Sequence, residues 1–191
     1  MRVTRARVAG FTISRVLAPL VVCSLAVIAG GCSTLWMTAP PSSAQQGQEV
    51  AALEQHVLPV VRDLKVTWYL REGVGDGSLY WQRGKFTRDK QRARDDGDQL
   101  FDGETEAAFE QMNRAIRTSG VPMNRLVDAQ YAADGTLRFA SFRRSGGGIK
   151  FVFNYIYSPG AKPPEWRSPL GPVVLTRIGE SDWWFEQSPD D

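Results

Sequence analysis

The chain is poor in the residues on which disulfide-rich secreted proteins and most nucleophilic or zinc enzymes depend. Its 191 residues include two cysteines, Cys23 and Cys32, and both lie near the N-terminus. The rest of the chain therefore has no disulfide, no thiol nucleophile and no cysteine metal ligand of its own. The single histidine is His56, so a catalytic triad or a histidine-based zinc site would have to use it.

Catalytic motifs are also missing. Ser145 is not part of a G-x-S-x-G nucleophile elbow, and His56 falls inside a predicted helix with no catalytic motif around it. We expect His56 to be a solvated helix position, with a catalytic role as the alternative. The sequence thus predicts no catalytic residue, no metal site and no cofactor.

An acidic run is the nearest approach to a metal motif. Asp95, Asp96 and Asp98 lie close together, but the EF-hand pattern fails because Leu100 and Phe109 would stand at ligand positions. We expect a solvated loop, and a looser calcium site is the alternative.

The charge balance changes along the chain. Of its 23 basic residues, four precede Cys32, where no acidic residue occurs. Removal of residues 1–31 leaves 19 basic against 21 acidic residues, a net charge of −2. This balance gives no reason to expect a nucleic-acid partner.

Those basic residues precede an apolar run that ends on small residues. Arg2, Arg5, Arg7 and Arg15 come before the run Val16–Cys32. A positive segment, a short apolar segment and small residues at its end are typical of a secretory signal peptide. The run is shorter than the roughly 20 residues that span a membrane comfortably. The twin-arginine pair is absent, which favours export in the unfolded state.

The end of this run resembles the lipobox of bacterial membrane lipoproteins. The matching residues are Ile28-Ala29-Gly30-Gly31-Cys32, with Ala29 where that family most often has leucine. The resemblance implies that a diacylglyceryl group alkylates the Cys32 thiol, that cleavage follows just before Cys32, and that a fatty acid such as palmitate acylates the new amino group. An uncleaved anchor, or ordinary cleavage nearby, is the alternative.

Three regions follow from this reading. Residues 1–31 are the signal peptide, and residues 32–48 are the lipidated cysteine and a flexible tether rich in Ser, Pro, Ala, Gln and Gly. Residues 49–191 form a single domain. We expect the mature chain to be lipid-anchored at the extracytoplasmic face of the cell membrane.

Two helices are predicted in this domain. Apolar residues at a spacing of 3.6 indicate a helix over Glu49–Leu64, which Pro59 kinks or divides. Lys65–Arg71 then alternates as a strand, unless the helix continues through Trp68. The second helix begins at Asp102 or Gly103 and runs to about Ser119, with an apolar stripe formed by Phe109, Met112 and Ile116.

The remaining elements are strands. A short strand at Leu79–Trp81 precedes the charged stretch 83–102, which is expected to be an exposed loop. Asp134-Gly135 is a hairpin signal, and Gly146-Gly147-Gly148 is a second turn. The later strands are predicted at Leu126–Ala132, Thr136–Arg143, Ile149–Tyr157, Val173–Ile178 and Trp183–Glu186. The fold class is α+β with two layers, an antiparallel meander of about four to six strands packed against one or two helices.

The last part of the chain resembles small uncharacterised proteins of actinobacteria. The matching features are Tyr157-Ser158-Pro159-Gly160 after a hairpin strand, Pro163-Pro164, and the closing strand with Trp183-Trp184-Phe185. The resemblance covers roughly residues 103–187. It implies the fold and no activity.

Two groups of side chains suggest binding, each with a structural alternative. The basic residues of 83–94 could contact phosphate-bearing lipids or wall polymers, although the neighbouring acids favour a compensated loop. Phe151, Phe153, Tyr155 and Tyr157 share one face of a strand. That face is expected to be core beneath a helix, with a sugar-stacking platform as the alternative.

Tryptophans are the candidate contact residues. Trp166 lies in a proline-rich loop, and Trp183 and Trp184 are adjacent in the closing strand. Neighbouring strand residues point to opposite faces, so one of that pair should face outward. Trp166 and the outward member could form a partner surface, whereas Trp166 could instead plug the edge of the sheet.

The sequence therefore predicts a lipid-anchored, non-enzymatic binding or interaction module of the cell envelope. Its partners would be the membrane, through the N-terminal lipid, and an envelope protein or wall polymer. The alternative is an envelope hydrolase that works with a converging pair of carboxylates.

Overall fold

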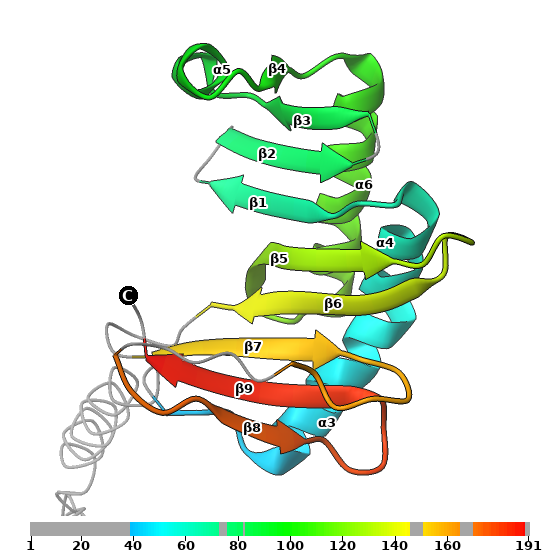
Figure 1. The fold of residues 1–191 in the computed structure, drawn as a ribbon, viewed down its shortest axis with the longest axis vertical. Helices are drawn as coiled ribbons and strands as arrows, with labels where there is room; N and C mark the ends of the chain where they lie inside the picture. Colours follow the sequence, from blue (N-terminus) through cyan, green and yellow to red (C-terminus); the bar gives the residue numbers. More distant parts are fainter. Residues whose placement is uncertain (1–38, 73–75, 82, 146–150, 165–169, 190–191) are drawn as a thin grey trace, which may run out of the picture. The chain divides into compact units, whose positions relative to one another are not determined.

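The computed structural model describes residues 39–72, 76–81, 83–145, 151–164 and 170–189 (Figure 1). Backbone contacts divide the chain into Met1–Met37 and Thr38–Asp191. The predicted signal peptide and Cys32 therefore lie outside the described residues, all of which belong to the second unit.

A long helical segment opens this unit. Helix α3 (Ser43–Ala52), a π-helical turn η1 (Leu53–Val57) and helix α4 (Leu58–Leu64) follow one another directly. The division predicted at Pro59 is confirmed, since this proline occupies the first turn of α4, where its missing N–H is tolerated.

The start of α3 corrects the predicted boundary at residue 49. The Ser42 hydroxyl accepts a hydrogen bond from the backbone N–H of Gln45 at 3.3 Å and caps the helix. Residues 43–48, which were assigned to the tether, are thus helical. These residues are polar and show no helical repeat of apolar positions. The Ser42 cap and the packing of the later turns of the segment therefore stabilise this part of the helix.

The segment ends at Lys65, which adopts a left-handed conformation with φ of 56°. The chain then enters strand β1 (Trp68–Glu72). The strand predicted for this stretch is therefore confirmed, although it begins later at Trp68, and the alternative of a helix continuing through Trp68 is wrong.

The strands within the described residues form one sheet of nine, in the order β4-β3-β2-β1-β5-β6-β7-β9-β8 (Figure 1). All neighbouring pairs are antiparallel except β3 with β4. The α+β class is confirmed, but the sheet is larger than the predicted four to six strands. The other strands are β2 (Asp76–Trp81), β3 (Gly84–Thr87), β4 (Gln99–Leu100), β5 (Met123–Tyr131), β6 (Leu137–Arg144), β7 (Phe151–Tyr157), β8 (Val174–Arg177) and β9 (Trp183–Pro189).

The charged stretch accounts for part of this difference. It was expected to be a loop, but it holds β3, the short helix α5 (Lys90–Asp95) and β4. Phe86 is buried against the core, and the Asp89 carboxylate caps α5 by accepting from the backbone N–H of Gln91 at 2.7 Å. Caps and single buried residues stabilise elements this short. In a sequence so rich in charged residues, these features do not form a recognisable pattern.

The predicted hairpins agree with the structure. Strands β5 and β6 flank the turn at Asp134-Gly135, where Gly135 has a φ of 81°. The Asp134 carboxylate accepts the backbone N–H of Thr136 at 2.8 Å. Strands β8 and β9 form the closing hairpin.

Helix α6 (Gly103–Ser119) begins where the sequence predicts. The Asp102 carboxylate accepts both the hydroxyl and the backbone N–H of Thr105 at 2.7 Å. These bonds, with one from Arg83, lower the pKa of Asp102 to about 2. The predicted stripe of Phe109, Met112 and Ile116 is buried.

Helix and sheet approach each other most closely at Gly77. A Cβ atom at this position would lie 2.2 Å from the ring of Phe109. Only glycine fits there, so the β1–β2 end of the sheet can pack directly on α6.

The main helices cover one face of the sheet. In Figure 1, α3, α4 and α6 lie behind it. On that side Phe153, Tyr155 and Tyr157 of β7 are buried, which confirms the core interpretation of these three residues. Phe151 at the end of the strand is 37% exposed and lies outside the core.

A buried ion pair ties α3 to this face. Glu49 of α3 is 8% exposed. Its carboxylate accepts two hydrogen bonds from Arg144 of β6, at 2.9 and 3.0 Å, and one from the Tyr155 hydroxyl at 2.6 Å. Burial acts to raise the pKa of Glu49, but the hydrogen bonds from Arg144, Tyr155 and Gln45 outweigh it and lower that pKa.

This network predicts a loss of stability in acid. Because the folded state lowers the pKa of Glu49 below its ordinary value of 4.5, the stabilisation is complete above that value and is lost as the pH falls through the folded pKa. Glu49→Gln should lower the free energy of unfolding at pH 7 by about 1–3 kcal/mol. It should also flatten the dependence of that free energy on pH below 4.5. Denaturant unfolding at a series of pH values measures both effects.

Glu54→Gln is the matched control, because Glu54 is exposed on the same helical segment. If Glu49→Gln and Glu54→Gln gave the same stability and the same pH dependence, the network would not hold α3 to the sheet.

Candidate functional site

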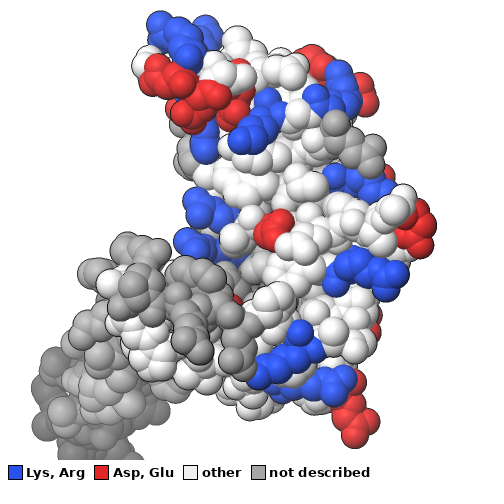
Figure 2. All heavy atoms as spheres, in the orientation of Figure 1, with Lys and Arg blue, Asp and Glu red and all other residues white. Residues whose placement is uncertain are grey.

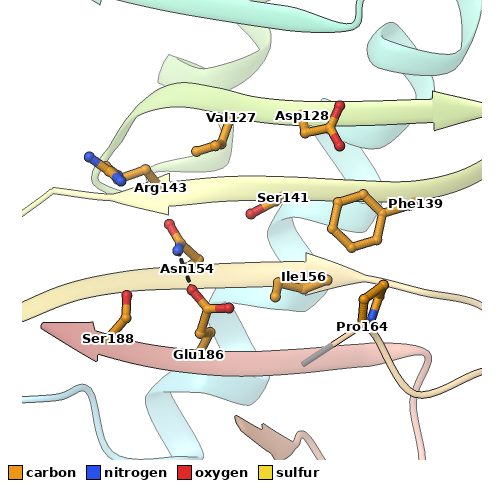
Figure 3. Close-up of a pocket in the computed structure, with 10 residues that line it drawn as sticks. All are labelled: Val127, Asp128, Phe139, Ser141, Arg143, Asn154, Ile156, Pro164, Glu186 and Ser188. Carbon is orange, nitrogen blue, oxygen red and sulfur yellow. Dashed lines mark hydrogen bonds between the residues drawn. The ribbon is translucent and has the colours of Figure 1, made fainter. Parts of the chain in front are cut away.

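The opposite side of the sheet is the candidate site. No described helix covers it over β5, β6, β7 and β9, and we call this part of the surface the open face (Figures 1 and 2). The middle of the open face is mostly uncharged in Figure 2. Its cavity of about 420 Å³ is lined by Val127, Asp128, Phe139, Ser141, Arg143, Asn154, Ile156, Pro164, Glu186 and Ser188 (Figure 3).

Strand register explains why these residues share one side. Period-two alternation places Ser141 and Arg143 opposite the core residues Ala140 and Phe142. Cross-strand pairing then aligns Arg143 with Asn154, and Asn154 with Glu186. These three polar residues form one row across β6, β7 and β9.

A bulge brings a further carboxylate to the cavity. The register between β5 and β6 shifts between Leu126 and Asp128. Both Val127 and Asp128 therefore line the cavity, although adjacent residues of a regular strand would point to opposite faces. Gln130 holds the Asp128 carboxylate through a hydrogen bond of 2.7 Å.

Asn154 is the most unusual residue of the site. It is 7% exposed, and its amide nitrogen donates to the Glu186 carboxylate at 2.7 Å (Figure 3). Its amide oxygen is buried and has no hydrogen-bond partner among the described residues. In Figure 3 this oxygen points toward the space between β7 and β6.

A second unpartnered atom lies in the same row. The Nε atom of Arg143 is buried and likewise lacks a partner among the described residues. A buried polar group without a hydrogen bond costs about 1–3 kcal/mol. An acceptor and a donor on paired residues of β7 and β6, both of which line the cavity, thus lack a described partner.

The two carboxylates of the cavity lie far apart along the sheet. Asp128 belongs to β5 and Glu186 to β9, with β6 and β7 between them. Three strand spacings separate their backbones by about 14 Å. In Figure 3 Ser141 and Ile156 lie between the two carboxylates, which do not point toward each other.

The tryptophans predicted as a partner surface have different positions. Trp183 is fully buried and packs on Phe142 and Tyr157 at ring distances of 5.8 and 5.4 Å. It is therefore a core residue and cannot belong to a partner surface, so Trp184 is the outward member of the pair. Trp184 points to the opposite face, as the alternation predicts, and is half-buried beside Arg177. Trp166 lies outside the described residues.

His56 lies in the π-helical turn η1, within the first helical segment. It is half-buried in the π-helical turn, and no hydrogen bond or ion pair is found for it among the described residues. Within the same residues, no group of three or more His, Cys, Asp or Glu side chains could hold a metal ion.

The basic cluster of the charged stretch is engaged by acids. Arg83 forms ion pairs with Asp102 at 2.8 Å and with Glu104 at 2.6 Å. Arg88 pairs with Glu106 and Glu110, and its hydrogen bond lowers the pKa of Glu110. This agrees with the compensated alternative for these two arginines.

Sequence reasoning missed the whole cavity, although one signal was present. Asn154 is the single amide in the aromatic and aliphatic strand Phe151–Tyr157. An amide inside such a strand must find a partner on the side away from the core. No comparable feature of the sequence indicates the bulge at Val127 or the position of Pro164 beside the cavity.

No model of a protein family matches this chain, and neither a curated protein nor a solved structure is significantly similar to it. In the part of the chain that the structure describes, no helix has both the length and the apolar character needed to cross a membrane.

Proposed function

We propose that this protein is a lipid-anchored, extracytoplasmic binding module of the cell envelope, and that the cavity of the open face is its ligand site. The single observation that supports the binding role is the pair of buried, unpartnered polar atoms on Arg143 and Asn154. Stable folds satisfy almost all such atoms, so exceptions call for an explanation. A ligand that bonds to both atoms supplies one.

The cavity has the character of a ligand site in other respects. Its volume of about 420 Å³ falls within the range of roughly 300–1,000 Å³ found for small-molecule sites. Phe139, Ile156 and Pro164 provide apolar walls beside the polar row. This combination is typical of sites that fix the orientation of a ligand with a few polar groups.

A hydrolase is the second candidate, because Asp128 and Glu186 both line the cavity. Paired carboxylates of glycosidases stand roughly 5–10 Å apart. The backbone spacing of about 14 Å and the orientations in Figure 3 favour binding over acid–base hydrolysis.

The anchor follows from the lipobox resemblance and gives a first prediction. Cys32→Ala should abolish labelling of the full-length protein with radioactive palmitate in a bacterial host, and unprocessed precursor should accumulate. The lipoprotein proposal is wrong if the variant is still labelled and processed like the natural protein.

Occupancy of the cavity can be tested with a thiol probe, because both cysteines of the chain lie in its first 32 residues. Ser141→Cys places a thiol in the cavity, and Arg138→Cys places one at an exposed position of the same strand. A small methanethiosulfonate reagent should modify the Ser141→Cys protein at least about tenfold more slowly in native envelopes than after purification, since a bound ligand excludes the reagent.

The Arg138→Cys protein should react equally fast in both preparations. Equal rates for Ser141→Cys in envelopes and in purified protein would contradict a ligand on the open face.

A further inference from the structure

We infer that the ligand of the open-face cavity is an uncharged, hydroxyl-rich saccharide. This inference rests on the proposed function and specifies its ligand class. It is carried by the chemistry of the polar row and of the apolar wall beside it.

The two unpartnered atoms require opposite hydrogen-bond partners. Arg143 Nε can only donate a hydrogen bond, and Asn154 Oδ1 can only accept one. These residues are paired across adjacent strands, and any single ligand group that bonds to both atoms has to accept and donate at once. A hydroxyl does both through a single oxygen atom.

Charged ligands fit this lining less well. A carboxylate accepts from Arg143 but leaves Asn154 Oδ1 without a donor. A phosphate at neutral pH can donate through its remaining P–OH group, but like a carboxylate it faces the carboxylates of Asp128 and Glu186. An ammonium group donates to the carboxylates and to Asn154 but leaves Arg143 Nε without an acceptor. Among the lining residues that the structure describes, one cation and two anions give a net charge of −1, which disfavours anions further.

The rest of the lining suits a sugar ring. The carboxylates of Asp128 and Glu186 accept hydrogen bonds from further hydroxyls. Phe139 stands on the same side of the sheet as these groups (Figure 3). Its ring offers a negative face to the polarised C–H groups of a sugar.

An ordered water also donates and accepts, so it is the competing occupant. The volume of about 420 Å³ and the wall of Val127, Ile156 and Pro164 favour a larger molecule with an apolar face. A saccharide has such a face on its ring, whereas water has none.

The inference is tested by titration of the full-length lipidated protein in a detergent without a sugar headgroup. Isothermal titration calorimetry would use neutral oligosaccharides of hexoses and N-acetylhexosamines, inorganic phosphate, and spermine. We expect at least one neutral oligosaccharide to bind and neither phosphate nor spermine to do so.

Arg143→Lys keeps the positive charge and removes the Nε–H donor. It should weaken saccharide binding by about tenfold or more. Arg138→Lys is the matched control, because Arg138 is exposed on the same strand outside the cavity, and it should bind like the natural protein. Thermal unfolding of both variants checks that the fold is kept.

Equal binding to Arg143→Lys and the natural protein would overturn the inference. So would Arg143-dependent binding of phosphate or spermine, which would keep a binding function but assign another ligand class. If no probe binds, the saccharide class is rejected, while protection of Ser141→Cys in envelopes still decides independently whether the cavity is occupied.

Discussion

The helices that the structure describes pack on one side of this sheet, so its central strands alternate between core residues and residues of the open face. On β7, Phe153, Tyr155 and Tyr157 are buried in the core, and the two tyrosine hydroxyls bond to Glu49 of α3 and Arg62 of α4. Asn154 and Ile156 of the same strand line the cavity of the open face. A strand that is buried on one face can satisfy its other face with water, with chain segments or with a ligand. The cavity lies on this second face, at the centre of β5, β6, β7 and β9.

Several charged residues outside the cavity join elements of the fold. Glu49, Arg144 and Tyr155 join the first helix to the sheet, and Arg83 and Arg88 join the charged stretch to α6. Exposed ion pairs of the second kind contribute little each, whereas the buried pair is costly to break. The polar row of the open face differs from both, because two of its buried atoms have no described partner.

The sequence predicts the elements with strong periodicity well. Helix α6 has a capping aspartate, an apolar stripe and a glycine stop, and the β5–β6 hairpin has Asp134-Gly135. The same alternation correctly separates Trp183 from Trp184, although it cannot say which of them is buried. That choice depends on the register of β9 against β7, where Trp183 pairs with Tyr157.

The features that the sequence does not predict depend on single contacts or on the pairing of strands. Strands β3 and β4 are too short for a period to appear, and α3 begins within a polar segment that only a cap and the Glu49 network reveal. The cavity combines residues from four strands and a loop. Its position requires both the strand order and the bulge at Val127, and neither has a signature in one sequence.

The most direct test of a ligand on the open face is a high-resolution crystal structure of the purified protein grown with an excess of a neutral oligosaccharide. The account predicts density for a ring-shaped molecule in the cavity, with one oxygen within about 2.7–3.2 Å of both Arg143 Nε and Asn154 Oδ1. It is contradicted if these two atoms bond directly to each other, or if the cavity contains nothing except separate water molecules.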